Sequence, residues 1–413
     1  MKAKKKQILL VSILSAAAFF AAFLTALASQ ATMPMLAAVP IAVAAACAAI
    51  LVLVFKKSRT MTCKKITIGC FAALLLFPML TLPLMSGREV ENIENRFLNT
   101  EFPPFRLEDY ETYPRSLDAF INDTVPFRQE MIQTHSAILM ATGSSPNDTV
   151  IIGDNNWLFY GNAQVMDEYM GMNLLNENQL AQIAQNLQGL QNYLAEQGIP
   201  LYVAVCPEKQ TIYPEYMPER YYRAAYTSTQ QITDYLSGTG LNFLYFKDSL
   251  TEAKDRCGYL YYTTDTHWCD TGAYIAFDEL MQQMKTDYVP LDFSDEDVLS
   301  YSGTGGDLNQ LTFSSAWIPK TGTAFTDDFF VQRGKLSERS GTLLLMHDSF
   351  EYAMDAFLRQ EYDQVLYNEN YAIFTEDLIL SSGQPDAVLL LMVERNAPGI
   401  LLGELADWAK YAG

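Results

Sequence analysis

The chain has 413 residues, with 28 lysines and arginines against 48 aspartates and glutamates, and 49% of its residues are hydrophobic. The first 85 residues contain nine of the basic residues and no acidic one, which leaves a net charge of −29 on residues 86–413. So acidic a segment excludes a general nucleic-acid-binding protein, because such proteins present positive charge to the phosphate backbone.

Three long apolar runs without a charged residue open the chain, at 8–28, 33–55 and 66–85. Each is close to the roughly 20 residues that a helix needs to span a bilayer, so residues 1–85 are predicted to be a membrane region with three transmembrane helices. Basic residues precede the first run and separate the second from the third. The positive-inside rule therefore places everything after Met85 outside the cytoplasm, and predicts a multi-pass protein of the cell membrane.

The first apolar run could instead be a signal peptide that is cleaved after Ala28. The run is longer than the roughly 7–15 apolar residues that signal peptides usually carry. Both interpretations leave residues 86–413 outside the cytoplasm, because two spans with the same basic loop would remain.

Residues 86–148 are predicted to be a connecting segment, with a polar start and a helix over 113–141 that is interrupted near Pro126. Residues 149–413 are predicted to form one α/β domain. It begins with a hairpin over 149–160, and an amphipathic helix over 177–197 then leads into an apolar strand over 200–206. This strand–helix–strand order predicts a parallel sheet flanked by helices. Further strands are expected at 242–246, 342–346, 364–367 and 387–393, further helices at 273–284, 349–358 and 375–381, and a long glycine-containing loop at 300–335.

Three cysteines lie in the outer domain, Cys206, Cys257 and Cys269. Cys257 and Cys269 could form a disulfide outside the cell, although an odd number leaves at least one thiol free. The cysteines show no spacing that is typical of metal ligands, so no metal site and no cofactor are predicted.

Two short motifs contain the residue types of acyl-transfer chemistry. Asp265 and His267 precede the predicted helix at 273–284, and a carboxylate at that spacing can orient an imidazole and stabilise its protonated form. Ser349 follows an apolar strand where a helix begins, which is the place where open α/β sheets keep their sites. The backbone N–H groups there can stabilise an oxyanion. The alternatives are a structural histidine and a serine that only caps the helix.

A third segment completes the pattern, because the apolar strand at 387–393 ends in Glu394, Arg395 and Asn396. A serine after one strand and an asparagine after another resemble the SGNH hydrolase superfamily. The Asp-x-x-His that those proteins carry near their C-terminal end is absent, and the Asp-x-His of Asp265 and His267 lies upstream instead. This order resembles the SGNH-like alginate O-acetylation proteins of the AlgX and AlgJ type and the related DHHW family. The resemblance extends over blocks at 94–96, 153–160, 207–209, 213–218, 265–268, 306–308, 348–350 and 394–396.

The resemblance implies a catalytic triad, in which Ser349 is the nucleophile, His267 the general base and Asp265 the group that orients it. It also implies that Asn396 and the backbone N–H of Ser349 are candidate oxyanion donors. Arg395 is a substrate-binding candidate, or pairs structurally with Glu394. Thr266 departs from the DHHW pattern, which has histidine at this position.

The function that the resemblance implies is a membrane-anchored, extracytoplasmic O-acetyltransferase that modifies a cell-surface or exported polysaccharide. Such proteins commonly work with a membrane-bound O-acyltransferase partner. Two alternatives stay open at this point. One is a carbohydrate acetylesterase with the same triad, and the other is a non-catalytic polysaccharide-binding or assembly protein.

Overall fold

The computed structural model describes residues 97–124 and 128–412. By its internal contacts the chain divides into two compact units, Met1–Thr142 and Gly143–Gly413. The three apolar runs, the signal-peptide alternative and the block at 94–96 lie outside the described residues. Among the helices of the described part, none is long and apolar enough to cross a membrane.

The described part of the first unit is helical. It contains the short helix η1 (Leu107–Asp109), then α4 (Tyr113–Thr124) and α5 (Arg128–Ala141). The helix predicted over 113–141 is therefore present, and its expected interruption lies at residues 125–127, outside the described residues. The backbone and side-chain amides of Asn99 both donate to the buried carboxylate of Asp123, at 2.8 and 3.1 Å, and so attach the start of the segment to α4.

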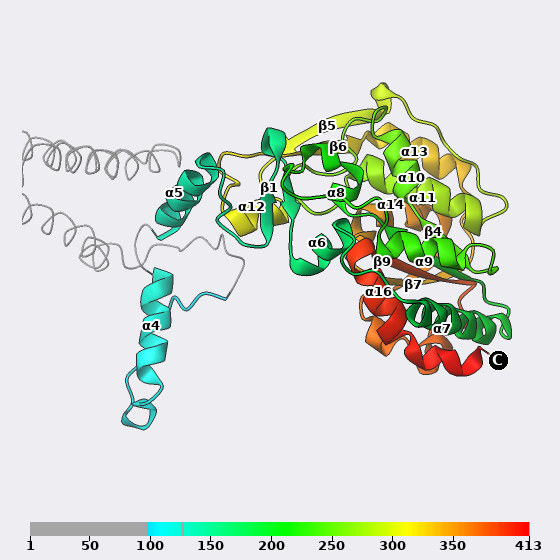
Figure 1. Cartoon of the computed structure of the whole chain (residues 1–413), viewed down its shortest axis with the longest axis horizontal. Coiled ribbons are helices and arrows are strands. Elements are labelled where there is room, and N and C mark those ends of the chain that lie inside the picture. Colours follow the sequence, from blue (N-terminus) through cyan, green and yellow to red (C-terminus); the bar gives the residue numbers. More distant parts are fainter. Residues whose placement is uncertain (1–96, 125–127, 413) are drawn as a thin grey trace, which may run out of the picture. The chain divides into compact units, whose positions relative to one another are not determined.

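The second unit is built around a parallel sheet of five strands in the order β4-β3-β9-β7-β8. Figure 1 labels β4, β7 and β9 among them. All seven residues of the central strand β9 are buried. A continuous apolar run is what a strand covered on both faces requires, and the predicted α/β class with a parallel sheet is confirmed. The strands are β3 (Leu201–Cys206), β4 (Asn242–Tyr245), β7 (Thr342–His347), β8 (Gln364–Asn368) and β9 (Ala387–Val393).

Alternate side chains of the strands enter two separate hydrophobic clusters, one on each face of the sheet. Leu389 and Leu391 belong to one cluster, and Val388 and Leu390 to the other. The first face is covered by α10 (Lys247–Ala253), α11 (Asp270–Met284) and α14 (Glu351–Glu361). The second is covered by α7 (Glu177–Ala195), α9 (Ser228–Leu236), α15 (Glu376–Ser381) and the C-terminal turns that begin with α16 (Ala397–Gly399). The helices predicted at 177–197, 273–284, 349–358 and 375–381 are thus confirmed within a few residues at each end.

Two antiparallel hairpins accompany the sheet. The first, β1 (Val150–Ile152) with β2 (Leu158–Tyr160), was predicted. The second, β5 (Val298–Gly303) with β6 (Lys320–Phe325), was not, because 300–335 was predicted to be a loop. That prediction is wrong, since the segment also contains α12 (Asp307–Thr312) and α13 (Asp327–Leu336). Four of the six residues of β5 are exposed, so this strand lacks the alternation of apolar and polar residues that marks a half-buried strand.

Short helices connect these elements and place residues near the sheet edge. They are α6 (Ala163–Tyr169) and α8 (Lys209–Ile212). Cys206, Cys257 and Cys269 are all free thiols, so the bridge between Cys257 and Cys269 that the sequence left open is not formed.

Candidate active site

The turn that carries Ser349 lies at the carboxyl end of β7, between His347 and the first residue of α14, Glu351. Asp348 holds this turn. One of its carboxylate oxygens accepts from the Phe350 N–H at 3.1 Å, and the other accepts from the Val393 N–H at 2.7 Å. The neighbouring strands β7 and β9 therefore fix the position of Ser349 from both sides, while its side chain stays half-buried and within reach of a substrate.

Asp265 and His267 form a second turn, which folds on itself. The carboxylate oxygen Oδ1 of Asp265 accepts from the backbone N–H of His267 at 3.1 Å and lies 2.7 Å from the ring nitrogen Nδ1. An aspartate that accepts from the backbone two residues onward is a common turn, and here the Asp-x-His spacing produces it. The arrangement places the Nδ1 proton toward Asp265 and leaves Nε2 as a hydrogen-bond acceptor.

The two turns meet at a single hydrogen bond, in which Ser349 Oγ lies 2.7 Å from His267 Nε2. A second contact ties the segments together, because the Trp268 indole N–H donates to the carbonyl of Phe350 at 2.9 Å. The structure therefore brings together the three residues that the sequence singled out. Since 28% of the His267 side chain is exposed, the pair is open to solvent on one side.

Lys209 binds the backbone of the turn that carries Asp265 and His267. Its ammonium group donates to the carbonyls of Tyr262, Thr263 and Asp265 at 3.1, 3.2 and 2.7 Å. The side chain is only 1% exposed, and burial lowers the pKa of Lys209 to about 7 against the opposing charges of Asp307 and Asp265. All three N–H groups of an ammonium are used here, which a neutral amine could not provide, so the contacts favour the charged form.

Lys320, the first residue of β6, contacts the side-chain carboxylate of Asp265, whose backbone carbonyl accepts from Lys209. Its Nζ lies 2.8 Å from Asp265 Oδ2 and 3.8 Å from the centre of the Tyr262 ring. Burial by itself raises the pKa of Asp265. The hydrogen bond and charge of His267, together with Lys320, outweigh it and hold the pKa of Asp265 below its usual range. Asp265 is therefore a carboxylate at any pH at which a histidine base works.

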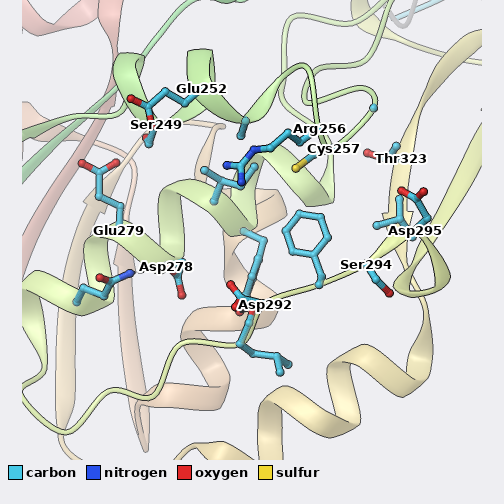
Figure 2. Close-up of a pocket in the computed structure, with 18 of the residues that line it drawn as sticks. Ser249, Glu252, Arg256, Cys257, Asp278, Glu279, Asp292, Ser294, Asp295 and Thr323 are labelled. Carbon is cyan, nitrogen blue, oxygen red and sulfur yellow. Dashed lines mark hydrogen bonds between the residues drawn. The ribbon is translucent and has the colours of Figure 1, made fainter.

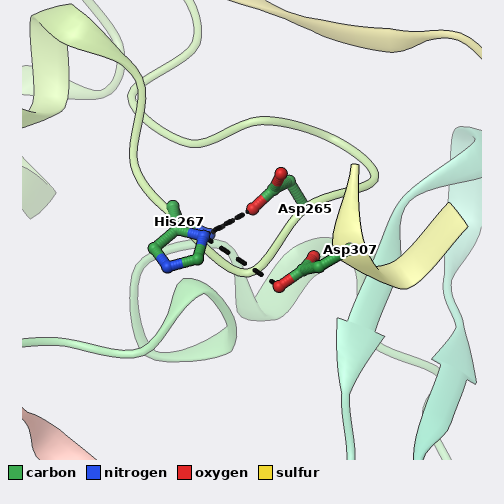
Figure 3. Close-up of side chains that lie close together, drawn as sticks. All are labelled: Asp265, His267 and Asp307. Atoms are coloured by element: carbon green, nitrogen blue, oxygen red, sulfur yellow. Dashed lines mark hydrogen bonds and ion pairs between the residues drawn. The ribbon is translucent and has the colours of Figure 1, made fainter. Parts of the chain in front are cut away.

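Asp307, the first residue of α12, is a second carboxylate beside the imidazole (Figure 3). Its Oδ2 lies 3.9 Å from His267 Nδ1, and its Oδ1 accepts from the backbone N–H of Thr266 at 2.8 Å. The Thr266 hydroxyl donates to Oδ2 of the same carboxylate. Thr266 thus links Asp307 to the turn that carries His267.

Asp265, His267 and Asp307 offer donor atoms within 4.8 Å of one another, a separation at which a cation could be held. Each of these atoms is already engaged. Nδ1 of His267 faces Asp265, Oδ2 of Asp265 receives the Lys320 ammonium, and Asp307 accepts from Thr266. A divalent cation would have to lie beside the positive charge of Lys320, so we assign the group to hydrogen bonding.

The residues after β9 lie at the same end of the sheet as Ser349, but their pairing differs from what was expected. Arg395 pairs with Glu208, at 2.6 Å from Nη1 to Oε1, so the predicted pairing with Glu394 is wrong. Glu394 is fully buried and accepts from the Glu208 backbone N–H at 2.7 Å. Asn396 reaches the Ser349 turn by donating to Asp348 Oδ2 at 3.3 Å. The strand ends at Val393 and Glu394–Asn396 form a 3-10 turn, so the alternation of the strand does not continue; Glu394 meets the backbone of Glu208 and Arg395 meets its side chain.

The described part of the chain also contains a cavity of about 740 Å³ between α10, α11 and the β5–β6 hairpin (Figure 2). Its charged lining residues are Glu252, Arg256, Asp278, Glu279, Asp292 and Asp295. None of Asp265, His267 and Ser349 lines it. The candidate active site is therefore the open end of the sheet and not this cavity.

Three residues of the site were given no role from the sequence. Lys209 and Asp307 stood in two of the family blocks, at 207–209 and 306–308. Lys320 lay within the segment predicted to be a loop. A lysine three positions after the end of an apolar strand, as Lys209 lies after β3, could have been recognised as buried at the end of the sheet. No local pattern indicates Lys320, since its contact with Asp265 bridges 55 positions of the chain.

Comparison with known proteins agrees with this architecture. Residues 150–344 match the family model of the SGNH hydrolase-like domain of acetyltransferase AlgX. The match includes Asp265, His267, Asp307 and Lys320 and ends just before Ser349. The predicted resemblance to SGNH-like O-acetylation proteins is thus confirmed.

One relative is the probable alginate O-acetylase AlgJ of Pseudomonas aeruginosa. It is 32% identical over 127 residues, which are 30% of this chain and 30% of that protein. Among solved structures, the O-acetyltransferase domain of Pseudomonas putida AlgJ is 18% identical, with a TM-score of 0.40, over 62% of this chain and 99% of that one. A DHHW family protein of Eubacterium siraeum is 19% identical, with a TM-score of 0.39, over 63% of this chain and 98% of that one.

Proposed function

We propose that the protein is a membrane-anchored, extracytoplasmic O-acetyltransferase that modifies a cell-surface or exported polysaccharide through Ser349, His267 and Asp265. The observation that carries the proposal is the continuous hydrogen-bonded path from Ser349 Oγ to His267 Nε2 and from His267 Nδ1 to Asp265 Oδ1, with both steps at 2.7 Å. A serine hydroxyl becomes a nucleophile when an adjacent base accepts its proton, and the base needs a third group to orient it.

The geometry suggests the order of proton transfers. His267 takes the hydroxyl proton as Ser349 Oγ bonds to the acyl carbon, and the Asp265 carboxylate stabilises the resulting imidazolium. The proton passes to the leaving group of the donor as the tetrahedral intermediate collapses, and an acetyl-serine remains. A sugar hydroxyl then gives its proton to His267 and attacks this ester. His267 returns that proton to Ser349 Oγ as the second tetrahedral intermediate collapses, which frees the serine and leaves the acetylated sugar.

The oxyanion that forms in each half-reaction needs donors near Ser349. The backbone N–H of Ser349, at the turn into α14, is one candidate. Asn396 is the other, because its amide donates to the carboxylate of Asp348 at 3.3 Å, and Asp348 is the residue that precedes Ser349 in the chain. Arg395 is a weaker candidate for binding the substrate, since its guanidinium is already paired with Glu208.

The membrane part of the proposal depends on the three apolar runs before residue 86 and on the basic residues around them. A transferase outside the cytoplasm needs an acyl group that is carried across the membrane, and three spans offer a surface on which a membrane-bound O-acyltransferase could deliver it. Protease added to intact cells should digest the region after Met85. Full protection of that region until the cells are lysed would contradict this topology.

The experiment that tests the function compares cells that produce the full-length protein with cells that produce Ser349→Ala. For a transferase, the variant lowers the ester-linked acetate released by base from purified surface polysaccharide, expressed per sugar. For an esterase with the same triad, the acetate rises instead. An unchanged acetate content, with the variant folded and present at the normal level, would favour a non-catalytic binding or assembly protein.

A further inference from the structure

Two charged side chains flank the pair of Asp265 and His267 from outside the Asp-x-His motif, and their charges are opposite. Lys320 Nζ lies 2.8 Å from Asp265 Oδ2, and Asp307 Oδ2 lies 3.9 Å from His267 Nδ1. A nearby carboxylate favours a protonated imidazole, and a nearby ammonium disfavours it. We propose that Lys320 and Asp307 are positioning residues that set the proton affinity of His267 in opposite directions. The proposal rests on the role of His267 as general base given above.

Lys320 acts through Asp265. The two oxygens of this carboxylate have separate partners, because Oδ1 faces the imidazole and Oδ2 faces the ammonium. The positive charge balances part of the negative charge that would otherwise stabilise an imidazolium. The lysine is well placed for this role, since only 20% of its side chain is exposed and its ammonium lies over the Tyr262 ring. The β5–β6 pairing holds its backbone opposite Gly303.

Asp307 acts directly on the ring and is itself held rigidly. Its Oδ1 accepts from the N–H groups of Thr266 and Leu308 at 2.8 and 2.7 Å, where α12 begins. The Thr266 hydroxyl, bonded to Oδ2, also lies 3.3 Å from His267 Nδ1. The Asp307 side chain is 39% exposed, so solvent screens part of its effect.

Two other charged groups border this cluster, and neither changes in the variants below. Lys209 holds the Asp265 carbonyl at 2.7 Å from α8. Asp348, next to Ser349, is engaged by the N–H groups of Phe350 and Val393. Because both stay in place, a difference between variants reports Lys320 or Asp307 alone.

Lys320→Met removes the ammonium and keeps the length of the side chain, and Asp307→Asn keeps an acceptor for the backbone N–H groups. In the full-length protein in detergent, Lys320→Met should move the acidic limb of the kcat/KM profile upward by about half to one pH unit, because the imidazole then protonates more readily. Asp307→Asn should move it downward by a similar or smaller amount. Lys320→Arg should restore the original midpoint, and Lys335→Met, which removes an exposed lysine of α13, should leave it unchanged.

The titration can also be followed without turnover, because the chain has only three histidines. Ring-carbon NMR of the protein labelled at histidine, with the His267 signal assigned by its loss in His267→Gln, should show the same two opposite shifts. If Lys320→Met does not fold, Asp307→Asn is sufficient when its thermal unfolding matches that of the wild-type protein, because the fold is then intact and the downward shift reports the lost carboxylate. Shifts in the same direction, or none larger than in Lys335→Met, would overturn the proposal.

The two proposals fail in different ways. A wild-type protein without acyl-transfer or esterase activity, or a folded Ser349→Ala protein with full activity, contradicts the proposed function and leaves the NMR titration valid. Activity that depends on Ser349 together with an unmoved His267 midpoint in both charge variants contradicts only the further inference.

Discussion

Lys209→Met tests whether the turn that carries Asp265 depends on one buried ammonium group. Methionine has nearly the same length and volume as lysine, so it fills the space between α8 and the turn and removes only the charge and the three N–H donors. The carbonyl of Thr263 keeps a second donor, the N–H of Leu158 at 2.9 Å. The carbonyls of Tyr262 and Asp265 lose the donor that Lys209 supplies.

The expected loss of stability is small because two effects nearly cancel. Two buried carbonyls without a partner cost about 1–3 kcal/mol each, or about 2–6 kcal/mol together. Burial of the ammonium is also unfavourable, since it lowers the pKa of Lys209 from 10.5 to about 7. At about 1.4 kcal/mol per pH unit, methionine recovers about 5 kcal/mol of this cost. The net change in the free energy of unfolding should therefore stay within about 3 kcal/mol.

The expected loss of activity is large. Without the hydrogen bond from Lys209 to the Asp265 carbonyl, the turn that carries Asp265 and His267 can move away from Ser349. A displacement of about 1 Å in a catalytic group costs on the order of 100-fold in rate. The assay is hydrolysis of a small activated acetyl ester by the full-length protein, with thermal unfolding measured on the same samples and Lys335→Met as the control. Activity of Lys209→Met within about threefold of wild type would show that the turn keeps its place without this ammonium group.

Two further predictions concern stability. Burial raises the pKa of Glu394 to about 8, so between pH 4.5 and 8 the folded protein holds a proton there that the unfolded chain releases. This contribution to the free energy of unfolding, of at most about 5 kcal/mol, is present at low pH and is lost as the pH rises through 8. The melting temperature of the wild-type protein should therefore fall between pH 5 and 9, and Glu394→Gln should make that fall shallower. A fall as steep in the variant as in the wild-type protein would contradict the assignment. Gly306→Ala should lower the free energy of unfolding by about 2 kcal/mol or more, because φ is +94° and the added Cβ would lie 2.4 Å from the Thr264 carbonyl oxygen. Chemical denaturation measures it, and a variant as stable as wild type would show that the Thr264 turn can move aside.

The parts of the fold that could be predicted are those in which burial imposes a regular pattern. The strand at 387–393 is apolar throughout because helices cover both faces, and the helix at 177–197 shows the periodicity of one buried face. The hairpin at 298–325 is different, since β5 is mostly exposed and is stabilised by its pairing with β6 and by ring contacts such as Tyr262 with Tyr301. Such contacts leave no periodic pattern along the chain.

The same distinction applies to the candidate site. Asp265 and His267 are two positions apart and form a local turn, so their pairing could be predicted from spacing. The placement of Ser349 could be predicted from the strand that precedes it. Lys320 and Asp307 reach His267 and Asp265 only because separate elements converge in space. The partner of Arg395 could not be predicted either, since the direction of each side chain after β9 depends on how the strand ends.

The position of β9 has a consequence for how the protein matures. This strand follows the other four strands of the sheet along the chain, yet it is the middle one and joins the β4-β3 pair to the β7-β8 pair. Neither pair can join the other until residue 393 has left the ribosome, and non-local pairing of this kind is slow to form. A chain that emerges N-terminus first therefore exposes two incomplete sheet edges until β9 has also emerged. Such edges are prone to aggregation, so we expect a dependence on holding chaperones until the C-terminal strand is inserted.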